Sequence, residues 1–381
     1  MHKHLAVVLG LALGAGAAVI RVPVATIPGS GGPNGIVLAA QNEILATSCQ
    51  VCSSANQVQL YAVGTWNLIA TLTISDSSVR VSSLAIQNNY IVVTADGGPN
   101  GNNGAAYIFT RPTDGWANET SSATLEPSDP EPGCAFGYSA AAWGNTVVIG
   151  APGCADGTGK AYVYIEPAGG WADATENAQL TATDSQGGWE VGGAVAVNGE
   201  VGGGGNLIAV GAWGGGVAYL YEEPNSGWAS MTQTAEIGAG VPDLFGTTVS
   251  LSKQVLAVGV PLYRDSNGIV GAVEIYDEPQ TGWVDQASPN YLLSEAQGKD
   301  LGAAVNITGR GVLTACCSTS NIKGHPSPRD TAYLWHEDQK WSETIKLSAK
   351  GLTATVTTST SLADWAFVGD EYGNIFIFDG K

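Results

Sequence analysis

The sequence predicts an all-β protein: a single seven-bladed β-propeller of four-stranded antiparallel blades, with the last blade completed by the N-terminal strand. Three observations predict it. A tryptophan recurs about every 55 residues, and a period of that length built from strands indicates a propeller or a β-solenoid. Four short apolar runs surround each tryptophan in the same order. Six units contain this tryptophan, and a seventh unit without it ends the chain. The tryptophans are Trp66, Trp116, Trp171, Trp228, Trp283 and Trp341.

The second strand of each unit is a continuous apolar run that ends in small residues. Such a run is typical of a strand buried on both faces, and its small last residues let neighbouring backbones approach closely. The strand occurs seven times, and this count sets the number of blades. The runs are residues 44–47, 91–95, 147–151, 207–212, 255–260, 312–316 and 366–369.

The third and first strands are defined by their position around the second. The third strand alternates aromatic and smaller residues, as in Ala161 to Tyr164, which indicates a half-buried strand. The first strand comes before each second strand, as in Ser139 to Trp143. A tight turn with glycine or asparagine, such as Gly144-Asn145, joins the two.

The fourth strand follows each of the six tryptophans, but the seventh unit ends at Lys381 before any fourth strand. Residues 22–29, VPVATIPG, belong to no unit of their own and resemble the missing piece. We therefore expect the N-terminal strand to complete the last blade. A ring closed in this way leaves no free sheet edge at its join.

The N-terminus resembles a secretory signal peptide over residues 1–20, with cleavage near residues 17–21 and one propeller domain over residues 22–381. Lys3 precedes an apolar stretch, Leu5 to Ile20, that contains the small-residue pattern Ala15-Gly16-Ala17. This stretch is shorter than the ~20 residues of a bilayer span, although an uncleaved anchor is the alternative. We expect a mature chain without a transmembrane segment that is secreted or extracellular, with the periplasm or the cell surface as alternatives.

The chain is strongly acidic, with 34 acidic and 15 basic residues and a net charge of −19. No lysine or arginine occurs between Lys160 and Lys253. Such a chain is repelled by phosphate backbones and anionic headgroups, which argues against nucleic acid as a partner. High acidity also keeps a protein in solution, and we expect a monomer.

One unit carries a recognisable motif. Phe136-Gly137 opens its first strand, Gly150-Ala151-Pro152 closes its second, and Gly159 to Tyr164 and Gly170-Trp171 follow. The unit resembles the FG-GAP repeat of integrin α-chain-type β-propellers, in the variety found in secreted bacterial and microbial proteins. The resemblance covers residues 22–381 and is strongest in blade 3. It implies an extracellular binding or adhesion module.

The chain departs from the calcium-binding members of that family, in which an acidic loop joins the FG strand to the GAP strand. Such loops supply the six to eight oxygen ligands that calcium prefers. Here the connection is a tight turn, except for Asn198 to Asn206, where Glu200 is the only acid. Asp265 to Gly268 has suitable spacing but lies in another loop, where a turn is the simpler interpretation. We therefore expect no metal site and no cofactor.

Six cysteines in an exported chain suggest disulfides. The hairpin turn at Gly144-Asn145 places Cys134 next to Cys154, and we expect them to be bonded. Cys49 and Cys52 form a CxxC in the matching loop of blade 1, where a local disulfide is favoured over redox catalysis. The state of the adjacent pair Cys316-Cys317 is left open.

Catalytic motifs are not found in the sequence, and we expect no enzymatic activity. Outside the N-terminal stretch the two histidines, His325 and His336, have no ligand spacing. Paired acids such as Glu222-Glu223 recur at the end of the third strand, which indicates a solvated turn rather than an acid–base pair. A polysaccharide hydrolase with carboxylates at the central channel is the rival hypothesis, but the first strands are almost free of acids.

The candidate binding surface is the long-loop face, which carries the loops between the second and third strands. Its longest loops are residues 97–104, 262–271 and 318–330, and long loops on a rigid scaffold often carry function. We expect a protein or glycan ligand there; a purely structural envelope role is the other alternative. Trp189 is interpreted as a packing residue in the slot of Phe136. The candidate ligand-binding residues are Trp213, Tyr263, Arg264, Lys323, His325 and Arg329.

Overall fold

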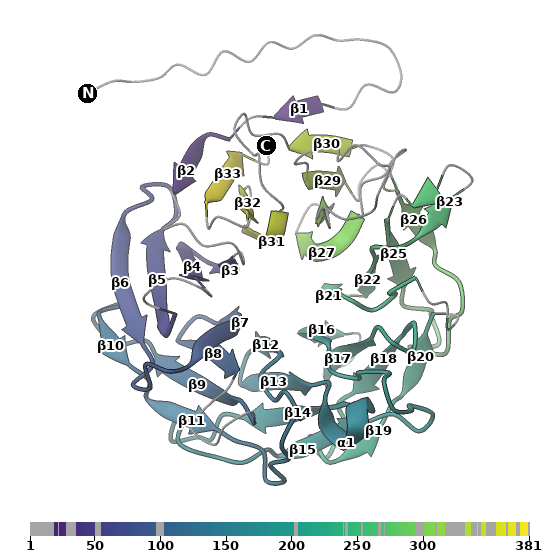
Figure 1. Cartoon of the computed structure of the whole chain (residues 1–381), viewed down its shortest axis with the longest axis horizontal. Coiled ribbons are helices and arrows are strands. Elements are labelled where there is room, and N and C mark those ends of the chain that lie inside the picture. Colours follow the sequence, from purple (N-terminus) through teal and green to yellow (C-terminus); the bar gives the residue numbers. More distant parts are fainter. Residues whose placement is uncertain are drawn as a thin grey trace.

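A computed structural model of the chain, shown in Figure 1, describes most of the predicted propeller. The described residues are 19–21, 23–27, 36–49, 55–96, 103–201, 205–238, 240, 243–252, 254–265, 268–269, 271–294, 301–308, 311–316, 332–336, 341, 344–347, 356–362, 365–370 and 374–379.

The strands form seven small antiparallel sheets. Each sheet is one blade, and its four strands are counted from the first to the fourth in the order in which they pair. Blade 1 contains β3 (Ile36–Gln41), β4 (Ile44–Cys49), β5 (Gln57–Ala62) and β6 (Leu68–Thr73), and blade 2 contains β7 (Arg80–Ile86), β8 (Tyr90–Asp96), β9 (Ala105–Thr110) and β11 (Ala123–Leu125). Blade 3 contains β12 (Ser139–Trp143), β13 (Thr146–Ala151), β14 (Lys160–Ile165) and β15 (Ala178–Thr181). Blade 4 contains β16 (Ala194–Val201), β17 (Gly205–Ala212), β18 (Val217–Glu222) and β20 (Ala235–Ile237).

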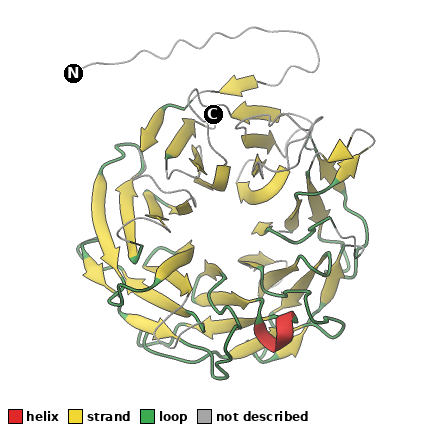
Figure 2. Cartoon of the chain, viewed as in Figure 1, coloured by secondary structure: helices red, strands yellow, loops and turns green. Residues whose placement is uncertain are grey.

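Blades 5 to 7 repeat the same order. Blade 5 contains β21 (Val249–Ser252), β22 (Val255–Val260), β25 (Ala272–Asp277) and β26 (Tyr291–Leu293), and blade 6 contains β27 (Leu301–Thr308), β28 (Gly311–Cys316), β29 (Ala332–His336) and β30 (Thr344–Leu347). Blade 7 contains β31 (Val356–Leu362), β32 (Trp365–Asp370), β33 (Ile375–Asp379) and β2 (Ala25–Ile27). Figure 2 shows that the regular structure is mainly strand, and that α1 (Cys154–Gly157) is a helical turn between β13 and β14.

The first strand of every blade lies nearest the axis of the ring, and each touches the first strand of the next blade. This inner circle runs through β3, β7, β12, β16, β21, β27 and β31 and returns to β3. The prediction of a seven-bladed all-β propeller is therefore confirmed.

The ring closes through the N-terminal strand. β2 pairs antiparallel with β33, with Ala25 opposite Ile377 and Ile27 opposite Ile375. It supplies the fourth strand that the C-terminal unit lacks, as predicted from residues 22–29, and Figure 1 shows it on the outside of β33. A blade built from both ends of the chain holds the first and last units of the ring together.

Glycines set how closely the blades approach one another, and the Phe-Gly and Gly-Ala-Pro motifs take part in the same contact. A Cβ added at Gly150 would lie 2.0 Å from the carbonyl oxygen of Gly192 in the next blade, so only glycine fits there. Ser139 Oγ donates to that same oxygen at 2.8 Å. Matching bonds join Ser82 to Gly137 and Thr248 to Gly302. The motif is therefore a packing device between blades.

The slot of Phe136 in blade 4 is filled by Val191, and our assignment of Trp189 to it is wrong. Gly192 donates its backbone N–H to Gly211, as Gly137 does to Gly150 in blade 3. Val191, just before Gly192, is buried, whereas Trp189 is half-buried and covers Gly215. The sequence-based assignment was two residues too early because an aromatic residue matches the Phe-Gly motif better than valine does.

A short segment, which we call the strap, lies on the outside of several blades. It connects the repeat tryptophan of one blade to that blade's fourth strand, and it runs parallel to the fourth strand of the preceding blade. β10 (Glu119–Thr120) pairs in this way with β6, and β19 (Met231–Thr232) with β15. Single parallel bridges join Ala174 to β11 and Gln286 to β20. The straps of blades 2 to 5 are residues 117–122, 172–177, 229–234 and 284–290.

Blade 7 takes its strap from the N-terminal segment. β1 (Val19–Arg21) pairs parallel with β30 of blade 6 and directly precedes β2, as a strap precedes a fourth strand. Residues 19–21 fall within the predicted cleavage window of residues 17–21. The signal peptide itself stays a prediction, and residues 1–18 lie outside the described residues.

Candidate binding site on the long-loop face

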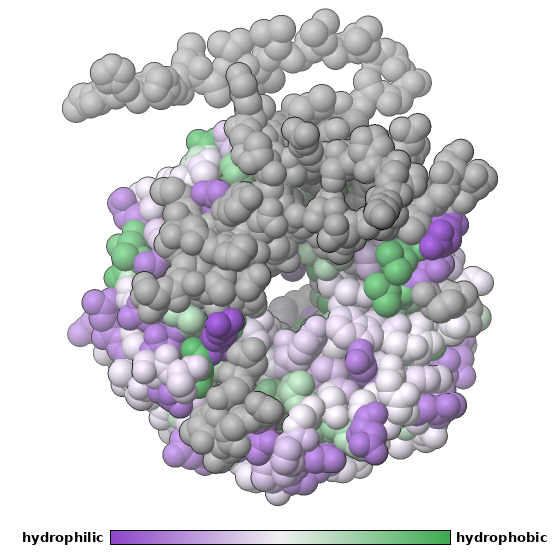
Figure 3. Space-filling model, in the orientation of Figure 1, coloured by the Kyte–Doolittle hydropathy of each residue, from purple (hydrophilic) through white to green (hydrophobic). Residues whose placement is uncertain are grey.

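The long-loop face is the face turned toward the reader in Figure 1, where α1 and β23 (Arg264–Asp265) lie. In the parts of this face that Figure 3 colours, strongly hydrophilic residues gather mainly around the periphery. Residues of intermediate hydropathy lie closer to the axis, where the surface is hollowed. The predicted candidates Trp213 and Tyr263 follow the ends of β17 and β22 on this face.

Trp213 forms an aromatic pair with Tyr138 of the preceding blade. The ring centroids lie 5.8 Å apart at an interplanar angle of 83°, an edge-to-face contact. Tyr138 is 44% exposed and Trp213 is half-buried, so the pair presents ring surface to solvent. In the repeat, Trp213 takes the position that Pro152 has in the Gly-Ala-Pro motif of blade 3.

The backbone between blades 3 and 4 holds the pair in place. Tyr138 directly precedes Ser139, whose hydroxyl is bonded to the Gly192 carbonyl. A Cβ added at Gly193 would lie 3.8 Å from the Trp213 ring, in ordinary contact. Gly193 donates its N–H to the carbonyl of Glu190, which has a left-handed backbone with φ 60°. The two rings thus stand on a fixed turn rather than on a long loop.

Glu190 gives this site a negative neighbour. Burial raises the pKa of the Glu190 carboxyl above its ordinary value. Burial also raises the pKa of the Tyr138 hydroxyl, and the negative charge of Glu190 raises it further. Tyr138 therefore remains a neutral hydrogen-bond donor throughout the physiological pH range. Neither Tyr138 nor Glu190 was among the sequence candidates; an unusual tyrosine directly after the Phe-Gly motif was the available clue.

The remaining candidates are dispersed. Tyr263 is half-buried against the core between blades 4 and 5, and its carbonyl accepts the N–H of Gly271. Arg264 is exposed in β23 (Arg264–Asp265), which pairs with β24 (Gly268–Ile269). Asp265 lies opposite Gly268 in this pair, and residues 266–267, where a turn is expected, lie outside the described residues. The candidates Lys323, His325 and Arg329 lie outside the described residues, and so does Cys52; Cys49 ends β4.

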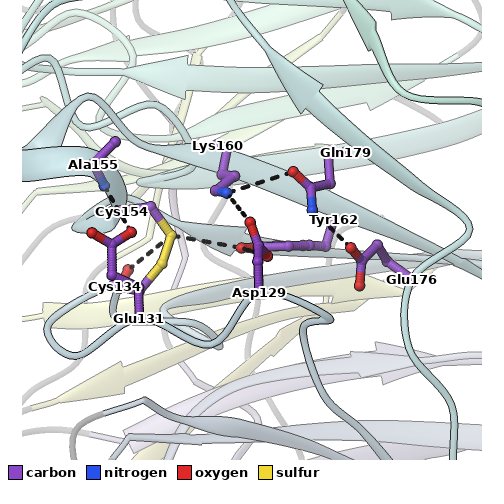
Figure 4. The surroundings of a disulfide bond; sticks show 9 residues. All are labelled: Asp129, Glu131, Cys134, Cys154, Ala155, Lys160, Tyr162, Glu176 and Gln179. Carbon is purple, nitrogen blue, oxygen red and sulfur yellow. Dashed lines mark hydrogen bonds and ion pairs between the residues drawn. A yellow bond between two sulfur atoms is a disulfide. The ribbon is translucent and has the colours of Figure 1, made fainter.

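The contact between blades 2 and 3 carries the predicted disulfide, Cys134–Cys154, shown in Figure 4. Beside it, Asp129 accepts a hydrogen bond from Tyr162 at 2.9 Å and forms an ion pair with Lys160. Gln179 links the lysine to Glu176. Burial alone would raise the pKa of Asp129, but the bonds from Lys160 and Tyr162 and the lysine charge outweigh it, so the pKa lies below its ordinary value.

The same place holds a group with metal-ligand geometry among the described residues. Glu131, Cys134 and Cys154 lie within 4.8 Å of one another. Because the two sulfurs are bonded to each other, neither is a thiolate, and thiolate is the form of cysteine that binds metals. Glu131 instead accepts a hydrogen bond from the N–H of Ala155 at 3.3 Å. The group therefore serves as a structural clamp on α1.

Comparisons with known proteins agree with this architecture. A family model described as FG-GAP repeat matches residues 120–164, which run from blade 2 into the third strand of blade 3. Among solved structures, the computationally designed Ika8 protein is similar, with a TM-score of 0.54 and 15% identity, covering 96% of this chain and 100% of that chain. No curated protein matches.

Seven four-stranded sheets arranged in a ring make the protein a seven-bladed β-propeller. The repeat matched over residues 120–164, and the recurrence of its glycine contacts between other blades, support an FG-GAP repeat β-propeller. Because propellers carry many unrelated activities, the designed neighbour shows the fold alone. Among the described residues no helix has the length and apolar character that a membrane span needs.

Proposed function

We propose that the protein is a non-catalytic binding or adhesion module, secreted or displayed at the cell surface, that recognises a protein or a glycan through its long-loop face. The observation that carries this proposal is the partly exposed aromatic pair, Tyr138 and Trp213, held by the backbone turn at Gly192-Gly193. Aromatic rings on a rigid support bury large contact area at little entropic cost, and they are enriched where proteins bind partners.

An extracellular location is supported by the disulfide Cys134–Cys154, because such bonds persist in oxidising compartments. The FG-GAP repeat supports it as well, since propellers of this type generally act outside the cell. The resemblance to the integrin α-chain type is consistent with adhesion.

The absence of catalysis is part of the proposal. A hydrolase of this fold would bring carboxylates together around the axis, where the first strands lie. In blade 3 that strand is Ser139–Trp143, and in blade 5 it is Val249–Ser252, neither of which carries an ionisable side chain. These sequences support a binding role over an acid–base mechanism, which needs a positioned proton donor and acceptor.

The test is a screen of the chain against arrays of glycans and extracellular proteins, with calcium and with a chelator. Trp213→Ala should abolish or reduce at least ten-fold the binding to any specific ligand found. Trp143→Ala is the matched control, because Trp143 is 37% exposed but ends β12 at the turn on the opposite face. Binding that survives Trp213→Ala and is lost with Trp143→Ala would refute the proposed surface, and binding that requires calcium would refute the expectation of no metal.

A further inference from the structure

The straps show how this propeller covers the outer edge of its blades. In four blades the backbone N–H of one residue in the fourth strand donates to a side chain located two residues after the tryptophan of the next blade. The bonds are 2.8 to 3.0 Å long, and each acceptor is the oxygen of an amide, carboxylate or hydroxyl. The pairs are Thr71 with Asn118, Thr124 with Asp173, Gln179 with Ser230, and Glu236 with Asp285.

Backbone bonds reinforce the straps in the same places. Ala174 donates to Thr124 and accepts from Glu126, both at 3.1 Å. Gln286 donates to Glu236 at 3.0 Å, and it accepts from Gly238 at 2.8 Å. Each strap therefore acts as a fifth strand on the outer edge of a blade. An edge that is covered in this way no longer offers unpaired backbone groups to other chains.

Blade 1 lacks a strap. Its tryptophan, Trp66, reaches blade 7, where it packs on Trp365 with centroids 5.2 Å apart, as Trp171 of blade 3 packs on Tyr90 of blade 2 at 5.3 Å. The chain then enters β6 after a single residue, whereas six residues separate Trp171 from β15. Trp66 itself has a left-handed backbone, with φ 59°. In blade 3 the residue with the left-handed backbone is instead the glycine that precedes the tryptophan.

The edge that this missing strap would cover belongs to β2, the last strand of its sheet, so closure of the ring leaves an outer edge there, contrary to the expectation from the sequence. β2 pairs with β33 in the same register in which β11 pairs with β9. The Val24 N–H donates to the carbonyl of Ile377, which is the partner of Ala25. In blade 2 the Ser122 N–H donates to the carbonyl of Ile108, which is the partner of Ala123. Thr26 therefore occupies the position of Thr124, whose N–H points outward to a strap. Among the described residues, none provides an acceptor for Thr26 N–H.

Exposed apolar side chains lie next to β2 in the sequence and at the start of β6, the outer strand of the neighbouring blade 1 (Figure 1). Val24 is 54% exposed, and Leu68 and Ile69 at the start of β6 are 50% and 41% exposed. Counted from the tryptophan, Leu68 stands where other blades carry the acceptor Asn118 or Asp173, and its side chain cannot accept a hydrogen bond. Apolar surface beside an uncovered strand edge is the arrangement at which extended peptides add to a sheet.

We propose that the outer edge of β2 is a docking site for an extended segment of a partner protein, which adds to blade 7 as a parallel strand in place of the missing strap. The straps define the chemistry of this segment. It carries an aspartate, asparagine or serine that accepts from Thr26 N–H, and it contributes apolar side chains to Val24, Leu68 and Ile69. This site is separate from the long-loop face, and it is occupied independently of that face.

The first test is amide hydrogen exchange on the whole chain. In the free protein Thr26 N–H is expected to exchange at least ten-fold faster than the strapped amides of Thr124 and Glu236. A synthetic peptide of residues 172–177, the blade 3 strap, should slow exchange at Thr26. The same peptide with alanine at its Asp173 position should not. Exchange at Thr26 that is already as slow as at Thr124 would overturn the proposal.

A graft provides the second test. Residues 172–177 inserted in place of Asn67 should give blade 1 its own strap, protect Thr26 N–H and eliminate peptide binding. The same insertion with Asp173→Ala is the matched control and should protect less. Peptide binding that persists in the grafted protein would contradict the site. Protection of Thr26 that rises with protein concentration, together with a dimer in sedimentation, would assign the edge to a second copy and refute a foreign partner.

Discussion

The contact between blades 2 and 3 and the contact between blades 3 and 4 use the same repeat but different chemistry. In both, a tyrosine of the third strand donates to an aspartate that follows the fourth strand of the preceding blade. The bonds, Tyr162 to Asp129 and Tyr219 to Asp184, are both 2.9 Å long. This tyrosine–aspartate bond is the constant part of the two contacts.

The neighbours of that bond differ. Lys160, beside Asp129, is replaced in blade 4 by Val217, and Gln179 is replaced by Glu236. Burial raises the pKa of Glu236, and the charge of Asp184, a hydrogen bond with it and the charge of Asp285 raise it further. The first contact is thus neutralised by a lysine, whereas the second holds carboxyl groups close together without one.

The comparison shows which positions the fold requires and which it leaves free. Both contacts keep the glycine approach and the tyrosine–aspartate bond. Blade 3 adds the disulfide Cys134–Cys154, and blade 4 instead places Trp213 against Tyr138 on the surface. The contact between blades 2 and 3, which the disulfide reinforces, therefore lies next to the contact between blades 3 and 4 that presents the candidate binding site.

Both contacts depend on a closed ring, so opening the ring should cause the largest effect. Deletion through Ile27 removes β1 and β2 and uncovers Ile375 and Ile377, which are fully or almost fully buried. Each buried isoleucine contributes about 1.5–3 kcal/mol, so we expect a loss of roughly 5 kcal/mol. Urea unfolding measures it.

Deletion through residue 18 is the control for this experiment, because it leaves β1 and β2 intact. Its free energy of unfolding should equal that of the full chain. An equal loss in both deletions would show that the N-terminal strands do not close the ring.

Removal of the disulfide should cost less and should act on the first contact only. Cys134→Ser with Cys154→Ser frees a loop with a sequence separation of 20 residues, for which we expect a loss of about 3 kcal/mol. Guanidinium unfolding measures the loss. Unchanged stability would mean that the ion pair and the aromatic packing hold this contact without the covalent bond.

Removing the lysine should remove stability from the first contact in a pH-dependent way. The folded pKa of Asp129 is lowered, so its contribution is present above the unfolded value of 3.8 and is lost as the pH falls. Lys160→Val should remove up to about 1 kcal/mol at pH 7, because the pair is partly exposed. This difference should shrink in thermal unfolding as the pH falls below 3.8; a difference that is independent of pH would indicate lost packing rather than lost charge.

Glu236→Gln should give the smallest effect, with the opposite sign. The folded pKa of Glu236 is raised, so the wild-type protein loses stability as the pH rises above the unfolded value of 4.5. The glutamine variant should be more stable at pH 7 by about 0.5 kcal/mol after screening by solvent. Thermal unfolding at pH 4 and pH 7 measures it, and a variant that is less stable at pH 7 would contradict the account.

The sequence predicted the strands and the ring closure because both depend on local patterns. Continuous apolar runs marked the second strands, and residues 22–29 matched the missing fourth strand. The disulfide also followed, since a two-residue turn fixes which residues face each other across a hairpin. Each of these depends on neighbours that the chain order specifies.

The site was predicted less well because it depends on contacts between blades. Trp213 was found from its place in the repeat, but its partner Tyr138 lies in another blade, 75 positions earlier in the numbering. The straps were missed because two residues pairing in parallel leave no periodicity in the sequence. Contacts of this kind are fixed by the packing of one blade on the next, which no local pattern records.

The central claim is that ligands bind at Tyr138 and Trp213 on the long-loop face. Hydroxyl-radical footprinting tests it most directly, with the strongest ligand from the arrays present and absent. The account predicts that Tyr138 and Trp213 become protected when the ligand binds, while Trp143 on the opposite face keeps its reactivity. Protection of Trp143 with unchanged oxidation of Tyr138 and Trp213 would contradict it.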